Sequence, residues 1–262
     1  MTVTGQVLAL GVLQGLTEFL PVSSSGHLVL AKTVLGLKTP EGATLEVVLH
    51  VGSMLSIMAY YRQRLLGLLR GLWCREPAAW LLLASILVAA VPVLVIYPLC
   101  GKQIEAQFDN PRLTAGLICV TGLLLLSTRL APAGRALPRP RSALALGLAQ
   151  AVALLPGISR SGSTLVVARW LRLDPGPAAE LSFLMVLPLL GGAALLHVPQ
   201  ALDPATRAAL PPLALAGGLV VSAGVGYGAL ALLVKVFSGA RFHWFGVYCL
   251  AVGLVGLWFL RA

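Results

Sequence analysis

Residues 15–27 read GLTEFLPVSSSGH, which places a carboxylate, three serine hydroxyls and an imidazole between two apolar stretches. A second polar segment lies far downstream at residues 156–164, PGISRSGST, and adds an arginine and four more hydroxyls, again between apolar runs. Ionisable side chains at membrane depth are costly, and where they occur they usually mark a functional site. We therefore expect the rest of the chain to act as a scaffold that brings these two segments together.

The composition is that of an integral membrane protein. The chain has 262 residues, of which 58% are hydrophobic and 11% are charged, whereas about 25% of residues are charged in soluble domains. The formal net charge of +10 fits the Lys and Arg excess of cytoplasmic loops, or binding of anionic lipid or a phosphorylated ligand. The arginines are scattered among short loops, which argues against a nucleic-acid partner. We expect a single all-α integral membrane domain over residues 1–262.

The apolar runs predict membrane-spanning helices and two interrupted hairpins. A spanning helix needs about 20 apolar residues. Each polar segment divides an apolar run into two shorter arms, which favours a re-entrant hairpin buried in protein over a single span. The arms are residues 3–20 and 27–37 in the first hairpin, and 142–155 and 165–171 in the second. The predicted spans are residues 44–61, 78–99, 113–128, 177–197, 211–237 and 242–260.

The two halves of the chain resemble each other. Residues 11–14 (GVLQ) align with residues 147–150 (GLAQ), and the first serine cluster aligns with the second. We expect repeats at about residues 1–130 and 142–262, each with one hairpin and three spans, so that the second is inverted relative to the first. Inverted repeats with interrupted segments place a binding site near the membrane midplane. Taking the arginine-rich loops at residues 62–75 and 129–141 as cytoplasmic, the first hairpin enters from the outside.

The second polar segment has the chemistry of a phosphate site. The guanidinium of Arg160 stays protonated and can donate two parallel hydrogen bonds to a phosphate. A helix that begins near Ser161 would direct free backbone N–H groups at an anion, and Gly157 allows close approach of the backbone. Further candidate contacts are Ser159, Gly162, Ser163 and Thr164. The alternative is a structural ion pair between Arg160 and a glutamate inside the helix bundle.

The first polar segment has residues suited to metal binding and to acid–base chemistry. Glu18 could hold a divalent cation such as Mg²⁺, act as a base, or balance the charge of Arg160. Gln14 lies four residues earlier, on the same helical face. A serine beside a histidine is the usual arrangement of an activated nucleophile, although a membrane histidine can also be a packing residue. The candidate catalytic residues are Glu18, Ser24, His27 and Arg160, with Ser23, Ser25 and Gly26 as substrate contacts.

A third group of polar residues lies on one face of a predicted helix. Glu46, His50 and Ser53 recur at positions i, i+4 and i+7, so they share a helix face. We expect these side chains to contact and orient the site residues without touching the substrate. Glu180 begins the matching helix of the second half and is expected to do the same there.

Together these residues resemble the undecaprenyl pyrophosphate phosphatases, the bacitracin-resistance BacA/UppP family of bacterial inner membranes. Residues 15–24 with Gly26 and His27 look like the family's first motif, and residues 156–162 with Thr164 look like its second. The resemblance covers essentially the whole chain. It implies hydrolysis of undecaprenyl diphosphate to the monophosphate and inorganic phosphate, with a divalent cation, Mg²⁺ or Ca²⁺. This reaction recycles the lipid carrier for cell-wall synthesis. The resemblance also implies two re-entrant hairpins that meet in a cavity open to the periplasm.

The same resemblance implies a role for each candidate catalytic residue. Glu18 takes the role of the essential carboxylate, and Ser24 that of a proposed nucleophile. His27 is a proposed base or phosphate contact, and Arg160 is the phosphate clamp. A water molecule activated by His27 or Glu18 could attack in place of the serine, and the sequence leaves this choice open.

Two positions depart from the pattern of the family. Gln14 stands where a glutamate is common, so this chain lacks one of the two carboxylates that would bind a metal together. The amide carbonyl of Gln14 or a water molecule could take that place. His50 stands where a glutamine is common, a change that the sequence does not explain.

A lipid-phosphate flippase is the competing class of function. Inverted repeats and broken helices are transporter features, and a flippase would use the same arginine and serines. However, a flippase needs no nucleophile next to a base, so the spacing of Ser24 and His27 favours an enzyme. A third option, a structural scaffold protein, predicts no buried ionisable cluster, and this chain has one. An enzyme that also flips the lipid, and assembly into a homo-oligomer, both stay open. The expected partners are the lipid substrate and membrane lipids.

Overall fold

A computed structural model of the chain describes residues 2–37, 44–132, 134–237 and 241–260. This described part is built from helices, with no strand and one isolated bridge between Ala136 and Leu173. A short 3₁₀ helix, Ala106–Asp109, extends α5. The α-helices are α1 (Val3–Phe19), α2 (Ser24–Leu35), α3 (Thr44–Tyr60), α4 (Arg62–Trp73), α5 (Pro77–Glu105), α6 (Pro111–Ser127), α7 (Pro140–Val152), α8 (Arg160–Trp170), α9 (Pro175–Leu184), α10 (Leu187–Leu202), α11 (Pro204–Ala209), α12 (Pro212–Phe237) and α13 (Trp244–Phe259).

Several helices are long and apolar enough to cross a membrane. Among the described residues these are α5 with its 3₁₀ extension (Pro77–Asp109), the α9–α10 segment (Pro175–Gln200) and α12 (Pro212–Phe237). Helices α6 and α13 are apolar but shorter, with 17 and 16 residues. The span predicted at residues 177–197 is interrupted, because α9 ends before residue 185 and α10 begins after residue 186. The fold is therefore that of an all-α, multi-pass membrane protein.

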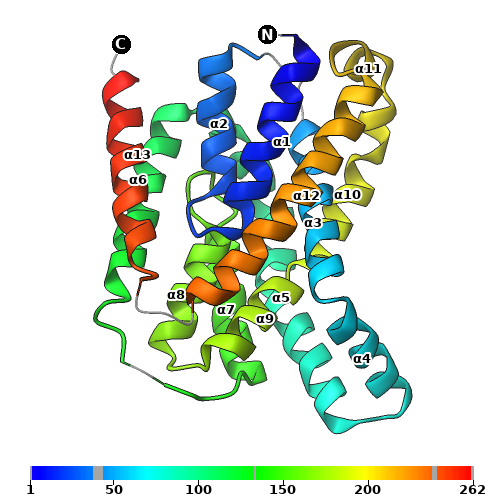
Figure 1. Ribbon diagram of the computed structural model, residues 1–262, viewed down its shortest axis with the longest axis vertical. Helices are drawn as coiled ribbons and strands as arrows, with labels where there is room; N and C mark the ends of the chain where they lie inside the picture. Colours follow the sequence, from blue (N-terminus) through cyan, green and yellow to red (C-terminus); the bar gives the residue numbers. More distant parts are fainter. Residues whose placement is uncertain (1, 38–43, 133, 238–240, 261–262) are drawn as a thin grey trace.

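The two polar segments form the tips of two helical hairpins. Residues 20–23 join α1 to α2, and residues 153–159 join α7 to α8. Figure 1 shows that α1 and α2 run from the end of the molecule where the N-terminus lies, whereas α7 and α8 lie toward the opposite end. The two tips touch directly, since Ser161 Oγ donates a hydrogen bond to the carbonyl oxygen of Leu20 at 3.3 Å. Segments far apart in the sequence thus meet near the middle of the molecule.

Each hairpin tip begins its second helix with the same serine cap. Ser23 Oγ accepts a hydrogen bond from the backbone N–H of Gly26 at 3.2 Å, and Ser159 Oγ accepts one from Gly162 at 3.0 Å. Such caps satisfy backbone groups that a helix start leaves unpaired, and each typically stabilises a helix by about 1 kcal/mol. The aligned serines of the two halves therefore have the same local structural role.

The turns of both tips use an unusual backbone conformation. Gly157 has a φ of 101°, and Ser23 has a φ of 69°, values that residues with a side chain seldom adopt. At Gly157 an added Cβ would also lie 2.4 Å from the carbonyl oxygen of Thr114. Glycine is required there both by the backbone angle and by the close approach of α6.

The loop predicted at residues 62–75 is wrong, because Arg62–Trp73 forms helix α4. This helix follows α3 after a bend of 72°. Its arginines are interspersed with leucines at helical spacing, so one face is apolar. Leu68 and Gly71 are buried, and Gly71 packs next to Ala79 of α5. The prediction weighed the arginines and overlooked the leucines, which together make an amphipathic helix.

Glycines allow neighbouring helices to approach closely. A Cβ at Gly11 of α1 would lie 2.7 Å from the carbonyl oxygen of Gly218 in α12. At the aligned position of the second half, a Cβ at Gly147 of α7 would lie 2.4 Å from the carbonyl oxygen of Ala89 in α5. Small residues at such contacts are typical of helix packing in membranes, where van der Waals contact drives association.

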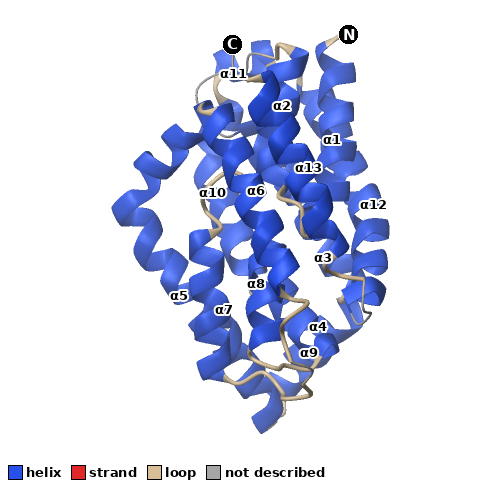
Figure 2. Ribbon diagram, turned by 90° about the vertical axis from the view of Figure 1, so that its left-hand side faces the viewer, coloured by secondary structure: helices blue, strands red, loops and turns tan. Residues whose placement is uncertain are grey.

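Helix α5 is bowed outward from the bundle. Figure 2 shows it bending away from the central helices, and Pro92 and Pro98 lie inside it. Proline removes a backbone hydrogen bond and clashes with the preceding turn, which is the usual cause of a helix kink. The bend leaves the part of α5 around Ala89 in contact with α7.

We expect Gly122→Ala to lower the thermal stability of the protein and Gly116→Ala to keep or raise it. Both glycines lie in α6. A Cβ at Gly122 would lie 2.8 Å from the carbonyl oxygen of Gly246 in α13, whereas a Cβ at Gly116 meets nothing within 4 Å. Overpacking typically costs about 1–3 kcal/mol, while replacing an unhindered helical glycine gains up to about 1 kcal/mol. Thermal unfolding in detergent measures both variants, and equal midpoints would contradict the close α6–α13 contact.

Candidate active site

Glu18 lies at the centre of the polar cluster where the hairpin tips meet. It occupies the last turn of α1 and is only 7% exposed. Its Oε1 atom accepts a hydrogen bond from Nη2 of Arg160, the first residue of α8, at 2.6 Å. Both side chains are largely withdrawn from solvent, so each neutralises the other's charge in a medium of low polarity. This ion pair joins the first hairpin to the second.

The second oxygen of Glu18 has three further neighbours. Ser24 Oγ donates a hydrogen bond to Oε2 at 2.6 Å, and Gln14 Nε2 donates one at 3.0 Å. His50 Nε2 lies 3.4 Å from the same oxygen. Side chains from four helices, α1, α2, α3 and α8, therefore converge on one carboxylate.

A chain of buried hydroxyl groups holds the amide of Gln14. Its Nε2 atom also donates to Ser53 Oγ at 3.3 Å, Ser53 Oγ lies 3.3 Å from Ser222 Oγ, and Ser222 Oγ donates to the carbonyl oxygen of Leu49 at 2.8 Å. Gln14, Ser53 and Ser222 are fully buried. The Oε1 atom of Gln14 has no hydrogen-bond partner among the described residues. The amide is thus fixed by its nitrogen and leaves its oxygen available.

Helix α9 lines the other side of the Arg160 guanidinium. Nη1 of Arg160 is 3.5 Å from the carbonyl oxygen of Ser182, which is a long contact. The guanidinium carbon lies 6.0 Å from the centre of the Phe183 ring. Thr164, one turn along α8, places its hydroxyl 2.7 Å from Ser182 Oγ. These contacts orient the guanidinium while leaving Nη1 only weakly engaged.

His27 is directed toward α13 rather than toward Ser24. Its Nδ1 lies 2.8 Å from the carbonyl oxygen of Ser23, and its Nε2 lies 2.9 Å from the hydroxyl of Tyr248, with the two rings stacked at 5.7 Å. Because a carbonyl oxygen only accepts, Nδ1 carries the proton and Nε2 accepts from Tyr248. Sequence reasoning missed Tyr248. Its only signal is a tyrosine within an apolar run, which interfacial aromatic residues share.

The remaining predicted hydroxyl contacts lie at the tips. Ser25 Oγ is 3.4 Å from Ser23 Oγ, and Ser161 Oγ is 3.4 Å from Ser159 Oγ, so the two tips repeat the same pair of hydroxyls. Ser163 is buried, and its Oγ has no hydrogen-bond partner in the part of the chain that the structure describes. The tips thus gather hydroxyl groups close to the Glu18–Arg160 pair.

The two glutamates predicted as supporting residues form other ion pairs. Glu46 pairs with Lys32 of α2, and its backbone carbonyl oxygen lies 2.6 Å from Nδ1 of His50. Glu180 pairs with Arg64 of α4 at 2.6 Å, so it is engaged with α4 instead of the Glu18 cluster. Helix α9 contacts Arg160 through later residues.

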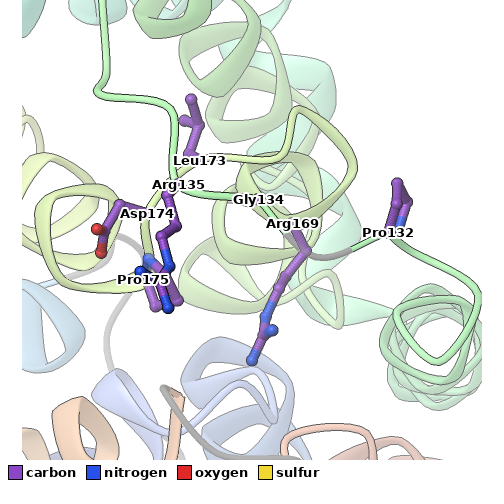
Figure 3. A pocket seen from close by; sticks show the side chains of 7 residues that line it. All are labelled: Pro132, Gly134, Arg135, Arg169, Leu173, Asp174 and Pro175. Carbon is purple, nitrogen blue, oxygen red and sulfur yellow. The ribbon is translucent and has the colours of Figure 1, made fainter.

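A pocket elsewhere in the molecule is distinct from this cluster. Figure 3 shows its lining, which comes from the loop before α7 and from the α8–α9 corner: Pro132, Gly134, Arg135, Arg169, Leu173, Asp174 and Pro175. Arg169 Nη2 donates to the carbonyl oxygen of Phe237 at 2.5 Å, and the carboxylate of Asp174 accepts the backbone N–H of Gly176 at 3.1 Å. Of the three charged residues in the lining, Arg169 and Asp174 are therefore held by the protein itself.

Comparison with known proteins identifies the family of this chain. The family described as "Bacitracin resistance protein BacA" matches residues 7–255. An undecaprenyl-diphosphatase of Salinibacter ruber is 39% identical, over 97% of this chain and 98% of the relative. Proteins of the same name from Desulfosudis oleivorans and Desulfatibacillum aliphaticivorans are 37% and 36% identical, with 97% and 95% of both chains covered. Since the match runs through both hairpins and nearly the whole length of these relatives, the chain belongs to the BacA family of bacitracin resistance proteins.

Proposed function

We propose that this chain is an undecaprenyl-diphosphatase of the bacterial inner membrane, which hydrolyses undecaprenyl diphosphate to undecaprenyl phosphate and inorganic phosphate. The observation that carries this proposal is the convergence of Arg160 and Ser24 on one carboxylate, Glu18, where the two hairpins meet. A cationic clamp, a hydroxyl and a base at one point are what phosphoryl transfer requires. The names of the relatives support the same reaction. The product would be reused as the lipid carrier for peptidoglycan, and its supply would confer bacitracin resistance.

Glu18 is within reach to activate Ser24. The Oγ–H of Ser24 already points at Glu18 Oε2, at 2.6 Å, which meets the distance requirement for a general base. Ser24 Oγ would attack the terminal phosphorus, its proton would pass to Glu18, and undecaprenyl phosphate would leave as the bond to the bridging oxygen breaks. Water would then hydrolyse the phosphoserine and release inorganic phosphate. Alternatively, a water molecule activated by Glu18 would attack the phosphorus directly, without a phosphoserine.

Arg160 would bind the diphosphate through the face that Glu18 does not use. Nη1 has only a 3.5 Å contact with the carbonyl oxygen of Ser182, which a phosphate oxygen can replace. The start of α8 adds backbone N–H donors and the positive end of a helix dipole. The Oγ of Ser163, which has no hydrogen-bond partner among the described residues, would add another polar group. Charge that develops on the transferring phosphoryl group would be stabilised by these preorganised donors.

A divalent cation, Mg²⁺ or Ca²⁺, is part of this proposal. Within the described residues no group of three His, Cys, Asp or Glu side chains could hold a metal ion. However, amide and carboxylate oxygens are ligands that both ions accept. The buried Oε1 of Gln14, which lacks a partner in the described ranges, fits such an ion together with the carboxylate of Glu18. A cation bound there would neutralise negative charge on the phosphates.

The proposal includes the arrangement of the hairpins in the membrane. We infer that both are re-entrant and belong to inverted repeats at about residues 1–130 and 142–262 of one integral domain. Matching serine caps, tips that approach from opposite ends of the molecule, and glycine contacts at the aligned Gly11 and Gly147 support this inference. Inverted repeats place the site near the midplane, and we propose that it opens to the periplasm while the polyprenyl tail lies along apolar helices.

Loss of either member of the ion pair is expected to abolish most of the activity. Arg160→Ala and Glu18→Ala should each lower phosphate release from undecaprenyl diphosphate by at least about 10²-fold, since electrostatic groups at the reacting centre contribute this much or more. Arg112→Ala, which removes an exposed arginine at the start of α6, is the matched control and should stay near wild type. Phosphate release in detergent, with and without a chelator, measures all three. No release from folded wild type with any divalent cation would overturn the enzyme proposal and favour a lipid-phosphate flippase.

Ser24→Ala is expected to reduce phosphate release far more than Ser25→Ala. Ser24 Oγ is 2.6 Å from Glu18 Oε2, whereas Ser25 Oγ is 3.4 Å from Ser23 Oγ. Removal of an enzyme nucleophile costs at least about 10³-fold in rate. Acid-quenched reactions with substrate labelled in its terminal phosphate should trap phosphoserine in wild type. A small effect of Ser24→Ala, together with no trapped label, would assign the attack to water.

His27 and Tyr248 are expected to act as one unit. Tyr248→Phe removes the hydroxyl that lies 2.9 Å from His27 Nε2 and keeps the stacked ring. One hydrogen bond is worth about 0.5–1.5 kcal/mol, so kcat/KM should fall by about 2- to 10-fold. The double variant with His27→Ala should be no worse than His27→Ala alone, because coupled residues are not additive. Fully additive losses would show that the two side chains act independently.

A further inference from the structure

His50 has a ring whose orientation is set by the backbone. It lies on α3, one turn after Glu46, with its side chain 24% exposed. Its Nδ1 atom is 2.6 Å from the carbonyl oxygen of Glu46. Because a carbonyl oxygen only accepts a hydrogen bond, Nδ1 carries a proton. In the neutral ring the other nitrogen, Nε2, therefore presents its lone pair.

Nε2 faces Glu18 Oε2, an oxygen that has no proton to donate. A protonated His50 would form an ion pair with this oxygen, whereas a neutral His50 presents a lone pair beside it. Glu18 Oε2 lies 3.4 Å away and already accepts hydrogen bonds from Ser24 and Gln14. A charge-assisted N–H···O bond is typically about 2.7–2.9 Å long, so this separation is long for a hydrogen bond. Two ligand atoms each about 2.1 Å from one metal ion, at tetrahedral or octahedral angles, lie about 3.0–3.4 Å apart. The spacing of Nε2 and Oε2 thus matches a pair of metal ligands.

Gln14, whose amide nitrogen contacts Glu18 Oε2, offers a third ligand atom. Its Nε2 is fixed by Glu18 and Ser53, and its fully buried Oε1 has no partner among the described residues. A buried polar atom without a partner calls for a water molecule or an ion. A ligating histidine usually donates its other ring N–H to a carboxylate or backbone carbonyl, which is the arrangement of His50 and Glu46 here.

We propose that His50 Nε2 is a ligand of the active-site cation, together with Glu18 Oε2 and Gln14 Oε1. The proposal rests on the proposed function and extends it, because it gives the cation a nitrogen ligand. Hard ions such as Mg²⁺ and Ca²⁺ favour oxygen ligands, whereas an imidazole raises the affinity for first-row transition ions. The site therefore accepts first-row ions such as Mn²⁺ as well as the Mg²⁺ or Ca²⁺ proposed above, with a higher affinity for Mn²⁺ that His50 sets.

The charges around the proposed site predict when the cation binds. Glu18 also pairs with Arg160, so the guanidinium and a bound cation would share the negative charge of one carboxylate. Glu46, on the same helix as His50, is engaged with Lys32. A diphosphate would add the missing negative charge, since Mg²⁺-like sites usually combine one or two carboxylates with substrate phosphates. Cation affinity should therefore rise when a diphosphate is bound.

The experiment is pulsed electron paramagnetic resonance of Mn²⁺ bound to the full-length protein in detergent, with an unreactive methylene-bridged prenyl diphosphonate present. Wild type should show coupling between Mn²⁺ and a nitrogen nucleus, and labelling of histidine with ¹⁵N should change that signal without altering the fold. His50→Gln should remove it. His197→Gln is the matched control, because Nδ1 of His197 also contacts a backbone carbonyl, that of Ala193 at 2.9 Å, on a different helix. This variant should keep the coupling.

A second readout follows the preference between ions. The ratio of Mn²⁺-supported to Mg²⁺-supported kcat/KM should fall at least about tenfold in His50→Gln and stay unchanged in His197→Gln. Bound Mn²⁺ without nitrogen coupling in wild type, or coupling that persists in His50→Gln, would overturn the proposal while phosphate release still stands. Conversely, nitrogen coupling that depends on His50 in a protein that releases no phosphate would support the ligand and overturn the proposed reaction.

Discussion

The buried ion pair between Glu18 and Arg160 is the interaction on which the centre of this structure depends. It joins two hairpins that are 142 positions apart in the chain. Charges withdrawn from water are costly, and removing one partner of a buried pair typically destabilises a protein by about 3–5 kcal/mol. Each hairpin tip is therefore stabilised in its place by the other. In the proposed function, a phosphate would compete with Glu18 for the guanidinium, so the same contact would serve both the fold and the chemistry.

Much of this centre could be predicted from the sequence, because charges are rare in it and therefore informative. Glu18 and Arg160 stand out between apolar runs, and the hairpin tips follow from the Pro, Gly and Ser residues beside them. What could not be predicted depended on tertiary contacts. Tyr248 meets His27 because α13 packs on α6, which also contacts α2. Glu180 forms an ion pair with Arg64 of α4, a helix that its arginines led us to predict as a loop. Spacing along one helix says which face a residue shares, but not which neighbour that face meets.

Helix α1 carries both close packing contacts and residues of the candidate site. Gly15 lies one turn before Glu18, and a Cβ there would come within 2.8 Å of the carbonyl oxygen of Ser222 in α12. The same serine belongs to the hydroxyl chain that holds Gln14. The depth at which α1 sits against α12 therefore sets the position of the carboxylate and of its supporting amide together. Because small residues and buried hydroxyls both drive helix association in membranes, the scaffold is built from the same kinds of contact as the site.

Ser23 shows how a local conformation limits what substitution can achieve. With a φ of 69° it occupies a backbone region that would be relaxed in glycine, at a cost of about 1–3 kcal/mol for a residue with a side chain. Yet its hydroxyl caps α2 and its carbonyl oxygen holds His27. Glycine would relieve the backbone and keep the carbonyl, but it would remove the cap. Neither serine nor glycine is therefore ideal at position 23. Selection for thermostability alone would favour glycine wherever the relieved backbone strain outweighs the lost hydrogen bond, and the start of α2 would then lose its cap.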